Sequence, residues 1–232
     1  MASSSSAHKV ARVAAKSGPG QHSNKAKNWL FPLAIVALVV LGVGVVAFAR
    51  SQNQGSGDNT TPPRANLQDG NPSDHWHQAF AVNICGREQP AFPTTATDPL
   101  GIHTHGDGLI HIHPFTVRAA GSRATMGKFW DLMGLTVTDD GIKMPDGKIY
   151  KEGSTTCDGK PAELVMAYWK DVATAETSKP TTIYRSGFSS VKFTHDLGAY
   201  TLAFVPKGTT EIPAPSSSQE ALNPSDVGSA GG

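Results

Sequence analysis

Three His-x-His pairs stand between residues 75 and 113 of this 232-residue chain. They are His75 and His77, His103 and His105, and His111 and His113. Neutral imidazole is a good ligand for zinc, copper, nickel and iron, so three such pairs predict a metal centre with six candidate ligands. Methionine and cysteine are scarce near the pairs, which argues against Cu(I) and favours Zn(II) or Cu(II). The competing interpretation is that these histidines face solvent or act as structural or pH-sensitive groups.

Residues 102–113 predict a β-hairpin, because a Gly-Asp-Gly turn separates two short alternating runs. A two-residue loop would send the two hairpin pairs to opposite faces. A three-residue loop, with Gly108 in the left-handed conformation, sets His103 opposite His111 and gathers all four hairpin imidazoles. We favour the three-residue loop, because it alone leaves an apolar reverse face that can be buried. That face consists of Ile102, Thr104, Ile110 and Ile112.

The upstream pair, His75 and His77, must come alongside the hairpin to complete such a site. The simplest arrangement is a strand whose Phe80 and Val82 continue the alternation. The sequence leaves open whether this strand approaches the hairpin.

Two carboxylates lie close to the pairs in sequence, Asp74 and Asp107. Each is a candidate ligand, general base, or acceptor that holds an imidazole in one tautomer. Asp107 stands between two glycines, which is more typical of turn chemistry. His195, next to Asp196, is a weak candidate, since His-Asp neighbours are common.

Residues 29–49 form an uncharged run of 21 residues dominated by Leu, Val, Ala and Ile. This length suffices for a helix to cross a hydrocarbon core about 30 Å thick. The 28 residues before it contain five Lys or Arg and no acid, so the positive-inside rule keeps the N-terminus in the cytoplasm. We predict a single-pass cell-membrane protein, in contact with the lipid bilayer, with an extracytoplasmic C-terminal part. A cleavable signal peptide is the rival, but its apolar region is usually about 7 to 15 residues long.

Composition divides the chain into five parts. Residues 1–28 are predicted to be a disordered basic tail, 29–49 the transmembrane helix, 50–73 a flexible linker, 74–212 the folded His-rich domain, and 213–232 a second disordered tail. The folded part has a usual size for one domain. Its two cysteines, Cys85 and Cys157, lie outside the membrane, where an oxidising environment favours a disulfide over free or metal-bound thiols.

The charge of the exported part excludes one class of partner. Of the 20 Lys plus Arg in the chain, six lie at or before Arg50, so 14 remain against 19 Asp plus Glu, a formal charge of 14 minus 19, or −5. Because nucleic-acid binding needs a basic surface, we expect no nucleic-acid partner.

The folded part predicts an α+β domain. One helix is expected after Thr125, a good N-cap, because apolar residues recur at helical spacing from Met126 to Met133 before Gly134 ends the run. Strand signals occur at 135–137, 142–144, 148–150, 162–170, 181–184, 191–193 and 199–205. We predict a small, mostly antiparallel sheet with one covering helix, of β-grasp type or, as the alternative, a small barrel.

Four stretches together resemble a group of uncharacterised actinobacterial single-pass membrane proteins. They are DHWHQAF at 74–80, GIHTHGDGLIHIHPF at 101–115, TMG at 125–127 and AFVP at 203–206. The resemblance covers the anchor and most of the ectodomain, and implies that the histidine motifs belong to one exported domain. It carries no activity, substrate or metal with it.

Three functions fit these observations. The leading hypothesis is a membrane-anchored, extracytoplasmic metal-binding domain that captures, buffers or delivers Cu(II) or Zn(II). The second is a metal-dependent enzyme or oxidoreductase at the same site. Any catalysis would depend on the metal, because the sequence has no motif for nucleophilic or phosphate chemistry. The third is an accessory subunit that binds a membrane protein partner and whose histidines are structural.

Overall fold

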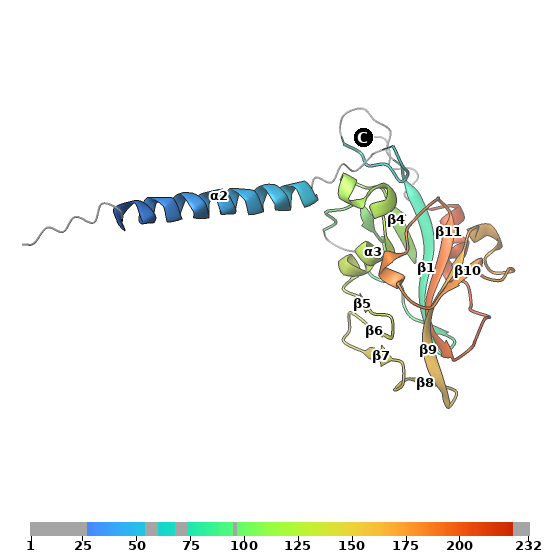
Figure 1. Cartoon of the computed structure of the whole chain (residues 1–232). Helices are drawn as coiled ribbons and strands as arrows, with labels where there is room; N and C mark the ends of the chain where they lie inside the picture. Colours follow the sequence, from blue (N-terminus) through green and yellow to red (C-terminus); the bar gives the residue numbers. More distant parts are fainter. Residues whose placement is uncertain (1–26, 54–59, 68–73, 95–96, 225–232) are drawn as a thin grey trace, which may run out of the picture. The chain divides into compact units, whose positions relative to one another are not determined.

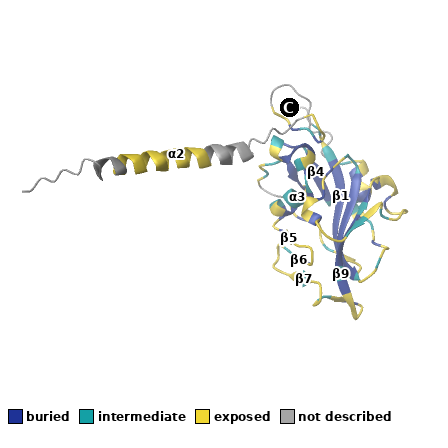
Figure 2. Ribbon diagram, viewed as in Figure 1, coloured by how far each residue is buried: buried dark blue, intermediate teal, exposed yellow. Residues whose placement is uncertain are grey.

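The computed structural model describes residues 27–53, 60–67, 74–94 and 97–224, and the chain divides into two compact units, 1–55 and 56–232. In the first unit, helix α2 (Lys27–Asn53) contains the predicted run 29–49 and extends beyond it at both ends. The side chains of residues 31–45, those described within α2, are all exposed (Figure 2). Among the described residues, no helix is both long enough and apolar enough to cross a membrane. Most of the predicted N-terminal tail, 1–26, lies outside the described residues.

The second unit is built on one large sheet (Figure 1). Its main path runs β10 (Thr182–Tyr184), β9 (Lys160–Trp169), β11 (Gly198–Pro206), β1 (Trp76–Ile84), β4 (Leu109–Ile112) and β3 (Ile102–His103). Two short strands lie off this path, β2 (Arg87–Glu88) beside β1 and β8 (Thr156–Cys157) beside β9. The central pair β1 and β11 is parallel, and the other pairs are antiparallel. The α+β fold with a mostly antiparallel sheet is therefore confirmed, and the described strands form an open sheet and not a barrel.

Helix α3 (Met126–Met133) covers one face of the sheet, as predicted (Figure 1). Its buried residues, including Phe129 and Trp130, pack in one cluster with Phe80 and Ile110 of the sheet. Gly134 adopts the left-handed conformation that ends the helix, with φ of 67°. Thr125 occupies the N-cap position, but its side chain makes no capping hydrogen bond. A small sheet of β5 (Thr136–Val137), β6 (Gly141–Lys143) and β7 (Ile149–Lys151) follows α3.

One predicted strand, 191–193, is wrong. Only Lys192 pairs there, in an isolated bridge to Thr125, because Val191 and Phe193 flank α3 and bury their side chains in its cluster. The apolar side chains at 191 and 193 are buried against the core, but the backbone of this segment forms no ladder with another strand. Short 3₁₀ helices make up the remaining connections: η1 (Val117–Ala119), η2 (Gly121–Arg123), η3 (Val172–Thr174) and η4 (Phe188–Ser190).

Two segments predicted to be loose are ordered where the structure describes them. Residues 213–224 form η5 (Ser216–Ser218) and η6 (Glu220–Leu222), and Ser217 Oγ donates to the Gly108 carbonyl at 2.8 Å. In the predicted linker, Ala65 is fully buried and Asn66 N donates to the Pro114 carbonyl at 2.9 Å. The amino-acid composition did not predict structure in either segment. Both segments are held by contacts with the sheet and its loops, which leave no local periodicity in the sequence. Residues 54–59, 68–73 and 225–232 lie outside the described residues.

The predicted disulfide is present. Cys85, in the turn after β1, is bonded to Cys157 of β8, with the two Cα atoms 5.1 Å apart. The bond closes a separation of 72 residues and joins the turn between β1 and β2 to the strand that precedes β9.

Candidate metal centre

Sheet register brings the three histidine pairs onto one face. In β1 and β4, His77 lies opposite His111, and in β3 and β4, His103 lies opposite His111. The upstream strand therefore comes beside the hairpin, which the sequence had left open. The register of the hairpin is the predicted one, with Gly108 at a φ of +78°.

The connection within the hairpin is longer than the predicted three-residue loop. The β3 and β4 ladder stops at the pair of His103 and His111, and residues 104–108 form the turn. Side chains replace the missing ladder bonds: Gly106 N donates to Thr104 Oγ1 at 3.2 Å, and Leu109 N donates to Asp107 Oδ1 at 3.0 Å. On the reverse face, Ile102, Ile110 and Ile112 are buried in the main core, as predicted.

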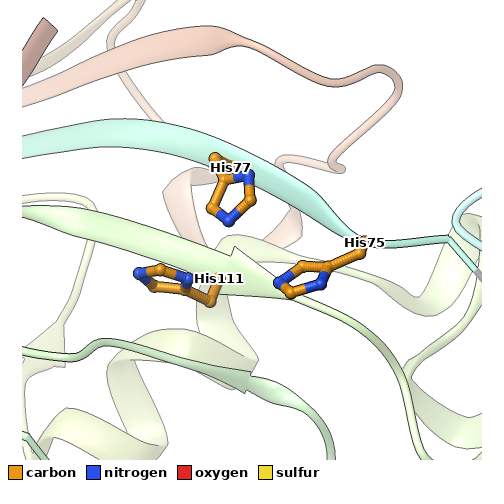
Figure 3. Close-up of side chains that lie close together, drawn as sticks. All are labelled: His75, His77 and His111. Atoms are coloured by element: carbon orange, nitrogen blue, oxygen red, sulfur yellow. The ribbon is translucent and has the colours of Figure 1, made fainter. Parts of the chain in front are cut away.

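Three imidazoles from two strands form the closest group of candidate ligands. One nitrogen from each of His75, His77 and His111 lies within 4.8 Å of the others, and we call this set the β1–β4 triad. Figure 3 shows the three rings around a common space, with His75 and His77 coming from the β1 side and His111 from β4. His77 and His111 are buried, whereas His75 is exposed.

The other three imidazoles belong to the hairpin. His103 Nε2 lies 3.2 Å from His105 Nε2 and 3.4 Å from His113 Nε2, and we call this set the hairpin triad. The two triads touch: the ring centroids of His105 and His111 are 4.4 Å apart, and those of His75 and His113 are 4.9 Å apart. All six predicted ligands thus belong to one continuous cluster.

Asp107 combines the two roles that the sequence suggested. Its Oδ1 accepts from the Leu109 backbone, which is turn chemistry, while its Oδ2 lies 2.9 Å from His111 Nε2. Burial opposes ionisation of Asp107, but the hydrogen bonds from His111 and the backbone outweigh it and lower its pKa to about 2. An ionised carboxylate only accepts hydrogen bonds, so the His111 proton sits on Nε2 and the lone pair of the neutral ring on Nδ1.

A second carboxylate, Asp98, escaped the sequence analysis. Its Oδ2 lies 2.6 Å from His103 Nδ1, and its Oδ1 accepts from the backbone N–H groups of Leu100 and Gly101. Burial again opposes ionisation, but these hydrogen bonds hold the pKa of Asp98 below its usual value. The available signal was Asp-Pro-Leu-Gly, a turn pattern directly before the hairpin.

The electrostatics of the cluster favour neutral imidazole at His113. Burial is the main cause, and the positive charges that His103 and His75 would carry add to it, so that the pKa of His113 falls to about 4. A neutral ring at neutral pH keeps a lone pair available for a metal ion.

The two other candidates, Asp74 and His195, have hydrogen-bond partners outside the cluster. The side chains of Asp74 and Arg64 form an ion pair, with Arg64 Nη2 2.8 Å from Asp74 Oδ1. The hydrogen bond from Arg64 lowers the pKa of Asp74. His195 Nε2 lies 2.9 Å from the Tyr168 hydroxyl and 2.8 Å from the Lys170 carbonyl. Its neighbour Asp196 contacts the backbone of the site, because Asp196 Oδ1 accepts from His77 N at 2.7 Å.

A cavity of about 680 Å³ adjoins the cluster on the side of the hairpin turn. Asp107 and Thr104 line it, together with Phe80, Phe129 and the 3₁₀ segment around Ser217. Because Asp107 also contacts His111, one carboxylate joins the cavity wall to a candidate metal ligand.

The donor set defines what the site can do chemically. Six imidazoles, two of them hydrogen-bonded to carboxylates, offer nitrogen ligands to a borderline divalent ion such as Zn(II) or Cu(II). The chain supplies no thiolate ligand, because its two cysteines, Cys85 and Cys157, are bonded to each other. No protein-family model, no curated protein and no solved structure matches this chain.

Proposed function

We propose that this protein is a membrane-anchored, extracytoplasmic metal-binding protein that captures, buffers or delivers Zn(II) or Cu(II). The β1–β4 triad is the binding site, and the observation that carries the proposal is the approach of its three imidazole nitrogens to within 4.8 Å of one another. Three nitrogen ligands leave a coordination position open, through which an ion can enter or pass to another protein.

The surroundings of the triad suit a divalent ion. His77 and His111 are buried and held by the β1 and β4 ladder, so little side-chain entropy remains to be lost on binding. Asp107 orients His111 and adds a negative charge one hydrogen bond away. Outer carboxylates of this kind fix the tautomer of a ligating histidine and raise its basicity.

Two features support the proposed location. The Cys85–Cys157 disulfide is typical of oxidising compartments outside the cytoplasm. The apolar run 29–49 supplies the proposed anchor, and the side chains of residues 31–45 within it are exposed in α2. A lipid bilayer would cover such a helix surface.

The test is the metal content of the full-length chain, produced without a histidine tag and measured by elemental mass spectrometry after equilibration with Zn(II) or Cu(II). We expect bound metal in the wild type and a lower metal content in His75→Ala, because this change removes one ligand of the β1–β4 triad. His75 is exposed, so the change leaves the core intact. His195→Ala is the matched control. A wild-type protein that takes up neither ion contradicts the proposal.

A metal-dependent enzyme is the second candidate, favoured by the cavity of about 680 Å³ whose wall includes Asp107. In that case Asp107 would carry out proton transfer for a substrate in the cavity, next to the ion on His111. The two candidates differ in what chelation does. Chelation removes the ion in either case, but it abolishes substrate turnover only if the protein is an enzyme.

A further inference from the structure

We propose that the hairpin triad, His103, His105 and His113, binds a second divalent metal ion, so that the cluster is a two-metal centre. This inference rests on the proposed function, because the second ion would lie next to the one on the β1–β4 triad. The division into two triads differs from the sequence-based expectation of a single metal centre with six candidate ligands.

The first argument is the hydrogen-bond geometry of His103. Its Nδ1 lies 2.6 Å from Asp98 Oδ2, an atom that only accepts hydrogen bonds when the carboxylate is ionised, so Nδ1 carries the proton. With the proton on Nδ1, Nε2 of the neutral His103 ring carries the lone pair. That single lone pair faces two more imidazole nitrogens, at 3.2 Å and 3.4 Å. One lone pair cannot accept two N–H donors well, whereas a cation among the three nitrogens would use all their lone pairs.

The second argument is distance. Zinc holds histidine nitrogen at about 2.0 to 2.1 Å in a tetrahedral site, which places two ligand nitrogens about 3.3 Å apart. The contacts of His103 Nε2 with His105 and His113, 3.2 Å and 3.4 Å, match that spacing. Both pairs therefore already lie at the separation that a shared ion requires.

The third argument is that His103 and His111, one from each triad, are not arranged to bind one ion between them. The rings of His103 and His111 are stacked, with centroids 5.7 Å apart and planes inclined by only 6°. Imidazole lone pairs lie in the plane of the ring, so those of two stacked rings run side by side and do not converge on one point. Each ring also has its own carboxylate, Asp98 for His103 and Asp107 for His111.

Charge favours this division. Two divalent ions on neutral imidazoles need nearby negative charge, and each triad has one carboxylate a single hydrogen bond from a ligand, Asp98 at His103 and Asp107 at His111. Solvent reaches both ions as well, because each triad has an exposed member, His75 in one and His105 in the other. Water can therefore complete each coordination sphere.

The test is a Zn(II) titration of the full-length, untagged chain, with bound zinc counted by elemental mass spectrometry. We expect two equivalents in the wild type, and one in each of two double variants, His105→Gln/His113→Gln and His75→Gln/His77→Gln. His195→Gln is the control and keeps two. Circular dichroism in the presence of chelator verifies that each variant is folded, and the wild-type stoichiometry tests the proposal without any variant.

The outcomes separate the two proposals. One equivalent in the wild type that persists in His105→Gln/His113→Gln overturns the second ion and leaves the proposed function standing. One equivalent that disappears in that variant but persists in His75→Gln/His77→Gln overturns both the two-metal centre and the assignment of the β1–β4 triad. No zinc in the wild type overturns the two-metal centre, and if the wild type takes up no Cu(II) either, the proposed function is contradicted as well.

Discussion

The two histidine triads use the same chemistry on different supports. The β1–β4 triad depends on two paired strands, and one of its rings, His111, is completely buried. The hairpin triad depends on a two-residue strand, β3, and on the segments that follow β3 and β4. In each triad a half-buried carboxylate is hydrogen-bonded to one nitrogen of one ring, Asp98 to His103 and Asp107 to His111.

The difference concerns rigidity. A ladder between strands fixes both partners of the pair His77 and His111, so the β1–β4 triad is preorganised for its ion. His105 lies beyond the end of the ladder and is exposed, so its position depends on the turn 104–108. We therefore expect the tighter ion on the β1–β4 triad and the more readily exchanged ion on the hairpin triad.

The largest expected effect is that of His111→Ala. It removes a ligand from the β1–β4 triad and leaves Asp107 without its imidazole partner, so affinity for the tighter ion should fall by more than the about 10- to 100-fold typical of lost outer partners. Competition with a zinc chelator of known affinity measures the loss. His105→Ala is the comparison, and it should leave the tighter ion within a few-fold of wild type. Equal losses in both variants would mean that the two triads are one site.

The carboxylates should have the next largest effects, each on its own triad. Asp107→Asn removes the charged acceptor of His111, and Asp98→Asn removes that of His103. We expect each change to weaken binding at its triad by about 10- to 100-fold, because an amide fixes the tautomer of a histidine less firmly. Two-step zinc titrations should show the first step weakened by Asp107→Asn and the second by Asp98→Asn. An effect of both variants on the same step would contradict this pairing.

Much of the site could be predicted from the sequence, because strand alternation is a strong constraint. A one-residue slip would have exposed Ile110 and buried polar groups, so the apolar face selected the register that pairs His103 with His111. The disulfide was predicted from the cysteine count and the expected export of the domain, and it is present. Long-range pairing was beyond reach: nothing local in 74–80 shows that β1 lies between β4 and β11.

The role of Asp98 shows where sequence reasoning stops. Asp74 and Asp107 were chosen because they stand next to histidines, yet Asp74 binds Arg64, while Asp98 reaches His103 from five residues away. The turn that begins at Asp98 curls back, with Gly101 N bonded to its Oδ1, and this curl brings the carboxylate to the ring. Distance along the chain was a poor guide here because the turn decided the contact.

A smaller effect is expected for pH on the stability of the metal-free protein. The pKa of His113 is lowered from 6.5 to about 4, so between these values the unfolded chain binds a proton that the folded chain does not. Stability should therefore fall as the pH drops from about 6.5 to about 4. Because the ring is only half-buried, we expect about 1 to 2 kcal/mol from this group. Urea denaturation with chelator at pH 7 and pH 4.5 measures it, and His113→Gln should reduce the difference. An unchanged difference in that variant would assign the pH effect to other groups.

The smallest effect belongs to His195→Ala, which tests whether the cluster or the mere number of histidines matters. His195 lies with Tyr168 and the Lys170 carbonyl, away from both triads. Removing its ring loses these hydrogen bonds, worth about 1 kcal/mol each, but no candidate ligand. We expect unchanged zinc stoichiometry and a small loss in thermal stability, measured by mass spectrometry and by calorimetry. If metal content fell as much as in His75→Ala, binding would follow histidine count and not the geometry that β1, β3 and β4 impose.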